Sequence, residues 1–558
     1  MNLSGLLSRI EGAPSLVRLR EARARAAKSL TVGVADSAKA AVVAVLASAG
    51  GGDGPLLVIV PREDRAEALI EELSAWLGAA APIVPFPERD TLPYERLAPD
   101  PEAVRQRLLA ASRLAQGERC LVVASAMALA QQTISPEELA TAKRVLGRGD
   151  RLSPDEFLRK LSALGYAIEP LVERPGQASR RGGIIDLFPP QAEAPVRIEL
   201  VGREIESLRR FDPASQRSVE PVESMELGPA REAVFTPDGK MGDALARLDL
   251  SICTDEARGR FQEELSLLRR GAGFTADYFY VPFLAQATLL NHLPPDATVV
   301  IDEESDMATA LDEAEQEAEA VRGELEERGE IPHGLPLPQK PWRELRAALY
   351  DRQAPLRLSR WASGEDAESV RLPFSPATAY GGQLRRLVSE SVTQLRQGSA
   401  IAVVSQQAQR LAELFDEQGV TARVTEEPPG TAGLALVQGS LPAGWHLSED
   451  DLDLTLITDT EVFGFAKQRR RAPRRGVGRE TFLAELSPGD YVVHIDHGIA
   501  RFVGLVRMAV DEHQREYLEL HYAEGDKLFV PTDQVDRVSR YVGPSDHEPR
   551  LTRLDSGD

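Results

Sequence analysis

Cysteine and long apolar runs are both scarce in this chain. It has two cysteines in 558 residues, Cys120 and Cys253, which are too few for a disulfide framework. Both lie in apolar surroundings, so we expect them to be core residues. No apolar run reaches the roughly 20 residues of a membrane span, and the first residues lack the basic start, apolar core and cleavage site of a secretory signal. These absences exclude a disulfide-stapled or membrane-spanning class and predict a cytoplasmic protein without membrane contact.

Positive charge is also in deficit, and the two signs are unevenly spread. The chain has 65 Lys and Arg against 87 Asp and Glu, a formal net charge of −22, which argues against a protein that grips DNA over its whole surface. We therefore expect DNA contact to be weak or absent. Thirteen acidic residues from Asp302 to Glu330 follow a helical pattern and predict a solvated acidic helix. Seven basic residues from Lys467 to Arg479 predict a linker, either solvated or in contact with nucleic acid or an acidic partner.

The remaining composition is typical of a multidomain α/β protein. Hydrophobic residues make up 42% and charged residues 27%, and the length allows about four domains of roughly 150 residues. Apolar runs predict buried strands at 56–60 and 120–123 with helices at 64–77 and 102–115. A second, smaller α/β set is expected at 399–404, 407–418, 434–437 and 454–457. Short strands at 491–493, 499–505, 517–522 and 527–530 predict a small β-barrel.

A phosphate-binding loop is present only in outline. The P-loop motif G-x-x-x-x-G-K-[ST] wraps phosphates with backbone N–H groups, and its hydroxyl holds Mg²⁺. Gly33 and Lys39 have the required spacing. Asp36 and Ala38 stand where glycines would be expected, and Ala40 replaces the hydroxyl. Asp36 would add negative charge beside an anionic ligand, so this loop is predicted to be degenerate.

An acidic pair follows a predicted strand at 297–301, as in a Walker B motif. A working pair would place Asp302 on Mg²⁺ and Glu303 on the attacking water. Without the glycines and the hydroxyl, we predict a vestigial, non-hydrolysing nucleotide-binding fold made of Gly33, Lys39, Asp302 and Glu303. The alternative is a working ATPase or DNA-processing enzyme, and Lys39, Asp302 and Glu303 favour it.

No other catalytic or metal-binding motif is evident. His494 and His497 form H-x-x-H, but on a strand and a turn rather than on a helix, with no nearby cysteine, so no metal site is expected. The sequence has no G-x-S-x-G motif and no Cys/His catalytic pair.

One segment after the first predicted strands resembles UvrB and the UvrB-like part of bacterial transcription-repair coupling factors. Its sequence is PFPERDTLPYERLAPDPEAVRQRL. In UvrB, a long aromatic β-hairpin that clamps damaged DNA would follow the tyrosine. Here Tyr94 is followed almost at once by Pro99, Pro101 and a helix. The resemblance therefore implies the fold without direct damage sensing.

Two further motifs resemble the inserted domain that UvrB and the transcription-repair coupling factors share. They are RGGIIDLFP, from Arg181, and the pattern I-x-S-L-R-x-F-D, from Ile205. The resemblance implies that this domain binds UvrA. By position, Arg181 and Arg197 match two arginines of the UvrA-binding surface, and Val201 stands where an aromatic contact residue would be expected. Arginine suits such a surface because it pairs bidentately with carboxylates; the alternative is two solvent-exposed arginines on a sheet.

The most specific resemblance lies near the end of the chain. PGDYVVHIDHGIARFVGL and EYLELHYAEGDKLFVP resemble the RNA-polymerase-interacting domain of the same family, a module shared with CarD-like transcription regulators. The resemblance implies contact with the polymerase β subunit along the strand after Gly504, through Leu505, Val506, Arg507 and Met508. An exposed apolar edge strand would bind by adding a strand to the partner's sheet.

The order of these resemblances predicts an α/β multidomain chain similar to the N-terminal half of transcription-repair coupling factors. The expected parts are a degenerate P-loop, UvrB-like α/β domain (1–142 and 228–372), an inserted α+β UvrA-binding domain (143–227), a small α/β domain (373–462), a basic linker (463–480), a Tudor- or SH3-like polymerase-binding β-barrel (481–545) and a further linker (546–558).

The resemblance also implies what this chain should lack. In the family an ATP- and Mg²⁺-dependent DNA translocase follows the barrel, and this chain ends about where that motor would begin. We therefore expect a non-enzymatic adaptor without cofactors that binds RNA polymerase and recruits UvrA for nucleotide excision repair. The alternatives are a UvrB-like, ATP-binding repair enzyme and a CarD-like transcription regulator without a repair role.

Overall fold

The computed structural model divides the chain into two compact units, Met1–Gln468 and Arg469–Asp558. It describes residues 1–25, 29–48, 54–233, 248–270, 273–274, 276–352, 354–361, 369–426, 428, 433–450, 452–464, 488–494, 497–510, 513–531, 538–540 and 551–552. Nearly all of the predicted basic linker and most of the predicted final linker lie outside these residues. Among the helices in the described ranges, none is long and apolar enough to cross a membrane.

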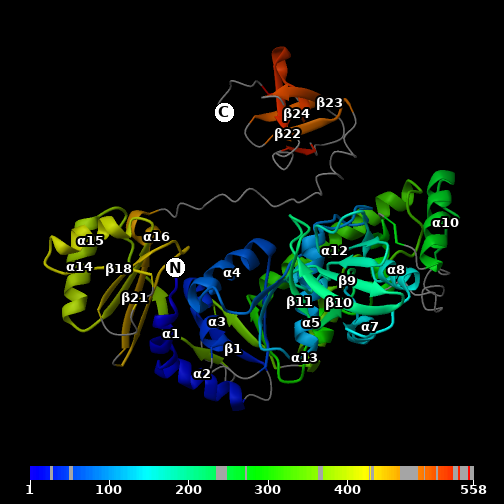
Figure 1. Ribbon diagram of the computed structural model, residues 1–558. Coiled ribbons are helices and arrows are strands. Elements are labelled where there is room, and N and C mark those ends of the chain that lie inside the picture. Colours follow the sequence, from blue (N-terminus) through cyan, green and yellow to red (C-terminus); the bar gives the residue numbers. More distant parts are fainter. Residues whose placement is uncertain are drawn as a thin grey trace. The chain divides into compact units, whose positions relative to one another are not determined.

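The first unit is built around a seven-stranded parallel sheet in the order β15-β1-β14-β13-β2-β4-β3. Figure 1 labels β1 of this sheet. Its strands are β1 (Leu30–Gly33), β2 (Leu56–Val60), β3 (Ile83–Phe86), β4 (Leu121–Ser125), β13 (Thr298–Asp302), β14 (Leu356–Ser359) and β15 (Ser369–Arg371). The strands predicted at 56–60 and 120–123 are confirmed, the second shifted by one to two residues. A mixed α/β fold with a parallel sheet is therefore confirmed.

Both faces of this sheet are buried, which explains the continuous apolar runs. In β2, Val58 belongs to one hydrophobic core and its neighbours Leu57 and Ile59 belong to another. Helices α1 (Ser4–Glu11), α3 (Lys39–Ala47) and α4 (Glu63–Leu77) contribute to the first core, and helices α5 (Pro101–Ala115), α12 (Glu304–Glu327) and α13 (Trp342–Arg352) contribute to the second. The helices predicted at 64–77 and 102–115 are confirmed to within one residue.

Three other predictions about this unit are confirmed. Cys120 and Cys253 are both buried. The acidic helix α12 buries only three of its residues, all apolar, as a solvated helix would; Asp302 and Glu303, the first two of the thirteen acids, precede it and are buried, which corrects the prediction for these two. Residues 87–100, all of them described, contain no strand, and α5 begins directly after them with Asp100 capping the N–H of Glu102. The long hairpin of UvrB is thus missing from this segment.

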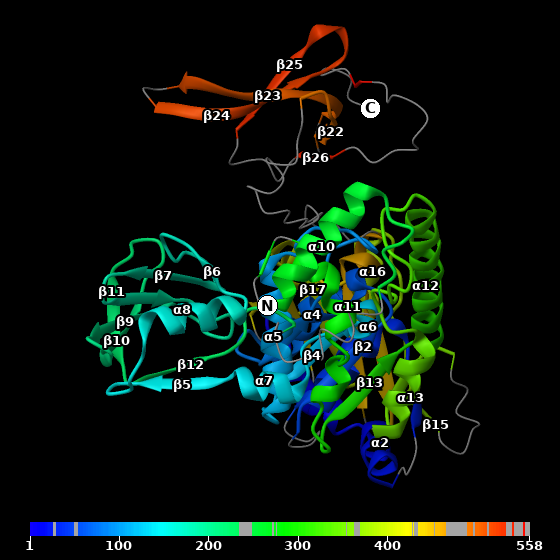
Figure 2. The same cartoon turned by 90° about the vertical axis from the view of Figure 1, so that its right-hand side faces the viewer.

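The inserted domain is a six-stranded sheet in the order β11-β10-β9-β8-β7-β6, beside the two-stranded sheet β12-β5. The strands are β5 (Arg144–Gly147), β6 (Ala167–Ile168), β7 (Gln177–Arg181), β8 (Ile184–Leu187), β9 (Val196–Val201), β10 (Glu204–Phe211), β11 (Ser218–Val222) and β12 (Ser224–Leu227). Helix α8 (Pro154–Ala163) covers one face (Figure 2), where Phe157 and Leu161 share a core with Ile185 and Ile198. Asp186 and Arg197 lie on the opposite face, together with the Phe211 ring against which Arg197 packs.

The smaller α/β sheet has the order β16-β20-β21-β17-β19-β18. Its elements are β16 (Phe374–Pro376), α14 (Leu384–Arg396), β17 (Ala400–Ser405), α15 (Ala408–Asp416), β18 (Val424–Thr425), β19 (Leu434–Gln438), β20 (Trp445–Glu449), β21 (Leu452–Thr458) and α16 (Asp459–Phe463). Sequence reasoning missed β16, β18, β20 and α16. Trp445 of β20 stacks on Trp76 of α4, with ring centroids 6.0 Å apart, within the same core as α1 and α3. This sheet therefore shares a core with the parallel-sheet domain.

The second unit contains a five-stranded antiparallel sheet in the order β25-β24-β23-β22-β26. The strands are β22 (Tyr491–His494), β23 (Gly498–Val510), β24 (His513–His521), β25 (Lys527–Pro531) and β26 (Val538–Arg540). β23 and β24 run side by side along most of their length (Figure 2), with a bulge at Val503. Val492, Phe502, Leu518 and Val530 form the core on one face.

Candidate functional site

The two arginines predicted to bind UvrA meet at one buried carboxylate on the open face of the inserted domain. Asp186 of β8 lies opposite Arg197 of β9 in the strand register and accepts two hydrogen bonds from it, Nε to Oδ1 at 2.7 Å and Nη2 to Oδ2 at 2.9 Å. Arg181, the last residue of β7, donates Nη2 to the same Oδ2 at 2.7 Å. The Asp186 side chain is only 1% exposed. The sheet thus brings both predicted residues together around an acid that sequence reasoning missed.

The two arginines differ in how firmly they are held. Arg197 also donates to the carbonyl of Gln216 at 3.3 Å, and its guanidinium lies 4.9 Å from the centre of the Phe211 ring. Hydrogen bonding to Asp186 raises the pKa of Arg197, so its charge is secured. Only 16% of the Arg197 side chain is exposed, against 50% for Arg181. Gln216 itself has a left-handed φ of 59°, a strained conformation that persists where surrounding contacts hold it.

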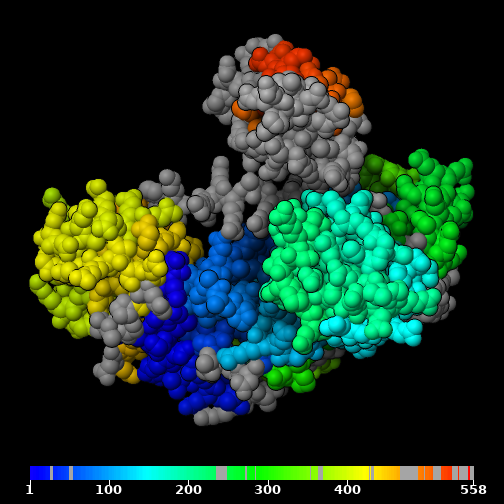
Figure 3. Space-filling view, in the orientation of Figure 1, coloured from blue at the N-terminus to red at the C-terminus, as the bar shows by residue number. Residues whose placement is uncertain are grey.

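Val201 ends β9 on the same side of the sheet as Arg197, because the two residues are four apart along one strand. It is exposed, so its position is compatible with the predicted contact surface. In the space-filling view, the inserted domain, coloured cyan to blue-green, presents a broad surface to the viewer (Figure 3). The three predicted residues thus belong to one face, and two of them touch the same acid.

The lysine of the degenerate phosphate loop is enclosed by carboxylates. Lys39 Nζ lies 2.6 Å from Asp302 Oδ1, 2.6 Å from Glu303 Oε1 and 2.7 Å from Asp36 Oδ1, with 2% of its side chain exposed. Burial alone would lower the pKa of Lys39, but the charge of Asp302 and the hydrogen bonds to all three carboxylates outweigh it and raise that pKa. The residues expected to hold phosphate and Mg²⁺ are therefore bonded to one another.

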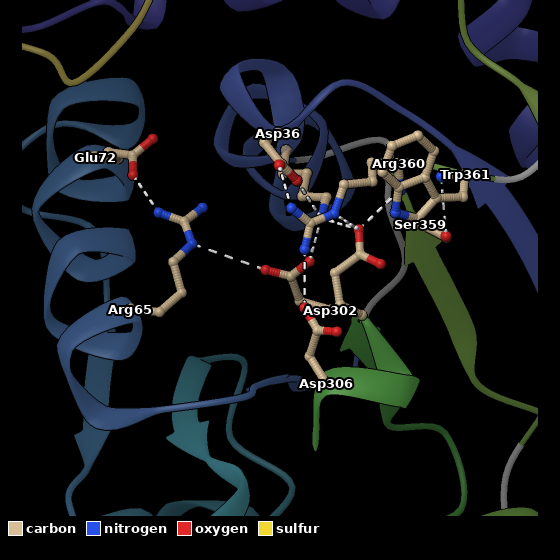
Figure 4. Close-up of polar contacts among 10 residues, drawn as sticks. Asp36, Arg65, Glu72, Asp302, Asp306, Ser359, Arg360 and Trp361 are labelled. Atoms are coloured by element: carbon tan, nitrogen blue, oxygen red, sulfur yellow. Dashed lines mark hydrogen bonds and ion pairs between the residues drawn. The ribbon is translucent and has the colours of Figure 1, made fainter. Parts of the chain in front are cut away.

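A second cation, Arg360, closes the same cluster and was missed from the sequence (Figure 4). Its side chain lies 3.2 Å from Asp36 and 2.8 Å from Asp306, and its backbone N–H donates to Glu303 at 2.8 Å. Glu303 sits in the left-handed region with a φ of 47°, where these contacts hold it. No sequence pattern marks Arg360, because it follows β14, far along the chain from the phosphate loop.

The backbone of the loop is equally unlike a phosphate cradle. Gly33 pairs with Ser359 and Arg371 as an ordinary strand residue, and residues Asp36–Ala38 form a 3-10 turn that leads directly into α3. The carboxylates around Lys39 and the 3-10 turn at Asp36–Ala38 do not fit the phosphates of a nucleoside triphosphate. Elsewhere, the rings of His494 and His497 stack at 4.8 Å, and the described residues include no group of three or more His, Cys, Asp or Glu arranged to hold a metal ion.

The predicted polymerase-binding residues lie in β23, which is an inner strand in the sheet order rather than an outer one. This corrects the expectation of an edge strand. β22, however, pairs only with residues 498–501 of β23, so that within the described residues the stretch from Leu505 to Met508 has a paired neighbour on one side, β24. Leu505 is 46% exposed. The side chains of Arg507 and Met508 lie outside the described part of the structure.

Comparison with known proteins finds a match to a domain-family model within each of the two units. Residues 145–232 match the family model of the UvrB interaction domain, and residues 486–542 match that of the CarD-like/TRCF RID domain. The first match covers the sheet that carries Arg181 and Arg197. The second covers the described antiparallel sheet of the second unit.

Over nearly its whole length, the chain is similar to transcription-repair-coupling factors. It is 28% identical over 552 residues to that of Bacillus subtilis and 29% identical over 564 residues to that of Myxococcus xanthus, covering 94% of this chain in each case. It spans about half of the relatives it matches, 46% of their length. The resemblance to transcription-repair-coupling factors is therefore confirmed.

Proposed function

We propose that this chain is an adaptor of transcription-coupled DNA repair that binds RNA polymerase and recruits UvrA. The observation that carries the proposal is the presence, in one chain, of a UvrB interaction domain and a CarD-like/TRCF RID domain in two separate compact units. Separate units suit an adaptor because each can engage its own partner.

The UvrA-binding site in this proposal is the open face around Arg181, Arg197 and Val201. Half of the Arg181 side chain reaches solvent beside an anchored second arginine. Arginine forms bidentate bonds with carboxylates and is enriched among residues that dominate interfaces. An acidic patch on UvrA is the surface that this face would accept.

The polymerase-binding site in this proposal is the stretch from Leu505 to Met508 of β23, in a small Tudor- or SH3-like barrel. Its support is the backbone edge that β22 leaves without a described partner and the exposed Leu505. Such an edge accepts a strand from another sheet, and the polymerase β subunit would supply that strand. Backbone hydrogen bonds would give affinity and alternate side chains would give specificity.

ATP hydrolysis has no part in the proposed function of this chain. A nucleotide would have to displace three carboxylates from Lys39 and approach the negative charge of Asp36 and Glu303. We propose that the cluster is a structural remnant, and that contact of this chain with DNA is weak or absent, in keeping with its net charge of −22.

A paired pulldown with purified UvrA and the RNA polymerase β subunit tests the adaptor. Met508→Arg should abolish polymerase binding and leave UvrA binding intact, while Phe529→Arg, which introduces the same charged side chain at a partly exposed position on β25, serves as the control. Polymerase binding that survives Met508→Arg would refute the assignment of this strand. Polymerase binding without any complex with UvrA would instead favour a CarD-like regulator, and ATP turnover lost in Lys39→Ala would favour a UvrB-like enzyme.

A further inference from the structure

A buried acid between two arginines has an uneven effect on them. Asp186 forms two hydrogen bonds with Arg197 and one with Arg181, all between 2.7 and 2.9 Å. The three side chains together carry one net positive charge. Since the carboxylate is nearly inaccessible to solvent, it cannot itself meet a partner protein. Its influence on binding can act only through the arginines.

Arg197 has little capacity left for a partner. Its guanidinium supplies both bonds to Asp186 and one to the Gln216 carbonyl, lies against the Phe211 ring and is mostly buried. A guanidinium has five N–H donors in a fixed fork. Three of the donors of Arg197 are therefore directed at its own domain.

Arg181 is placed differently. One Nη2 hydrogen bond to Asp186 holds its guanidinium, and half of the side chain remains exposed. That single bond restricts the rotation of a long side chain before any partner arrives, which lowers the entropy lost on binding. The arrangement leaves other donors of the Arg181 fork for a carboxylate of the partner.

We propose that Asp186 is a positioning residue of the UvrA-binding face, which holds Arg181 as the contact residue and uses Arg197 as its anchor. This inference rests on the proposed function and divides roles that the sequence assigned equally to both arginines. The positioning role and the charge of Asp186 predict opposite effects of its removal on binding. Removing the negative charge of Asp186 makes the face more positive, which would strengthen attraction to an acidic partner, yet loss of positioning should weaken binding.

The experiment measures the affinity of the full chain for purified UvrA in four variants. Asp186→Asn should weaken binding roughly tenfold, whereas Glu220→Gln, which removes the same charge from an exposed pair with Arg210 on the same sheet, should change it less than about twofold. In an Arg181→Ala background, Asp186→Asn should have little further effect, because the residue it positions is gone. Binding that stays equal or becomes tighter in Asp186→Asn would overturn the inference.

Folding and function are controlled separately. Thermal unfolding and polymerase binding of Asp186→Asn report whether the inserted domain and the second unit stay intact. If that variant unfolds, Arg181→Lys at the half-exposed position decides the matter, because it keeps the charge but loses the fork. It should weaken UvrA binding roughly tenfold, and unchanged binding would refute the role of Arg181. Failure of the unaltered chain to bind UvrA at all would refute the proposed function itself.

Discussion

Glu232→Gln should loosen the junction where the inserted domain returns to the parallel-sheet domain. The side chains of Arg107 and Glu232 are both 0% exposed, and Arg107 Nε donates to Glu232 Oε1 at 2.7 Å. Arg89 donates to the other oxygen of the same carboxylate at 3.1 Å. Arg107 lies on α5 and Arg89 follows β3, so one carboxylate joins three separate segments. Loss of the Glu232 carboxylate should therefore also destabilise the segments that carry Arg107 and Arg89.

The magnitude follows from what glutamine keeps and loses. It preserves the shape of the side chain but leaves two buried guanidinium groups opposite a neutral amide. Breaking a buried pair by removing one partner costs about 3–5 kcal/mol. Arg107 retains a 2.9 Å hydrogen bond to the Pro87 carbonyl and a 4.1 Å contact with the Phe86 ring, so we expect a loss of about 3 kcal/mol, at the lower end of that range.

Amide hydrogen exchange in α5 is the suitable assay, because a chain of 558 residues with several sheets does not unfold in one step. The opening free energy of α5 should fall by about 3 kcal/mol in Glu232→Gln. The exposed-pair variant Glu220→Gln should leave it within about 1 kcal/mol of the original. If the opening free energy of α5 decreases by less than about 1 kcal/mol in Glu232→Gln, the pair does not hold this junction.

The pH dependence provides an independent check on the same pair. Burial alone would raise the pKa of Glu232, but the charges of Arg107 and Arg89 outweigh it and lower that pKa. A carboxylate with a lowered folded-state pKa stabilises the fold above its unfolded pKa of about 4.3 and loses that contribution as the pH falls through its folded value. The difference between Glu232→Gln and the original chain should therefore shrink in acid. A difference that is constant down to the lowest accessible pH would contradict the ion-pair explanation.

Glu63→Gln should stabilise the chain above pH 7, because burial and the nearby Glu88 raise the pKa of Glu63 from 4.5 to about 7. A carboxyl group with a raised folded-state pKa favours the fold below its unfolded pKa, and that contribution is lost as the pH rises through about 7. The increase in melting temperature caused by Glu63→Gln should therefore vanish near pH 4. An equal increase at pH 4 and above pH 7 would refute this cause. Lys39→Ala should lower the melting temperature, because the buried Asp302 loses its 2.6 Å ion pair and keeps only the 3.8 Å contact with Arg65. Mg²⁺ and ATP should not raise the melting temperature of the original chain; a rise that Lys39→Ala removes would contradict the closed phosphate site. Trp445→Ala should cost about 3–5 kcal/mol by opening a cavity beside Trp76, and unchanged amide exchange in α4 would show that the two sheets do not share a core.

The features that sequence reasoning located correctly depend on local pattern. Runs such as 56–60 are apolar throughout because both faces of their sheet are covered, and that composition alone identifies a buried strand. The prediction of a degenerate phosphate loop also uses local pattern: Asp36 and Ala38 add side chains where glycines would be expected, and Ala40 lacks the required hydroxyl. The strands that sequence reasoning missed lack such a local pattern. β16 and β20 are short strands, and their pairing depends on a neighbour rather than on their own residues.

By itself, the sequence determined the buried strands at 56–60 and 120–123 and the order of the two domains that match known families, because apolar runs and motifs express these directly. Only the tertiary structure decided how charges are paired. Arg360 reaches Asp36 across 324 residues, and Asp186 draws Arg181 and Arg197 together from neighbouring strands. The energy of such contacts depends on distance and burial in the folded chain, neither of which a linear pattern records. The same holds for β23: among the described strands, β22 is too short to pair with the stretch from Leu505 to Met508, and the residues of β23 do not show this.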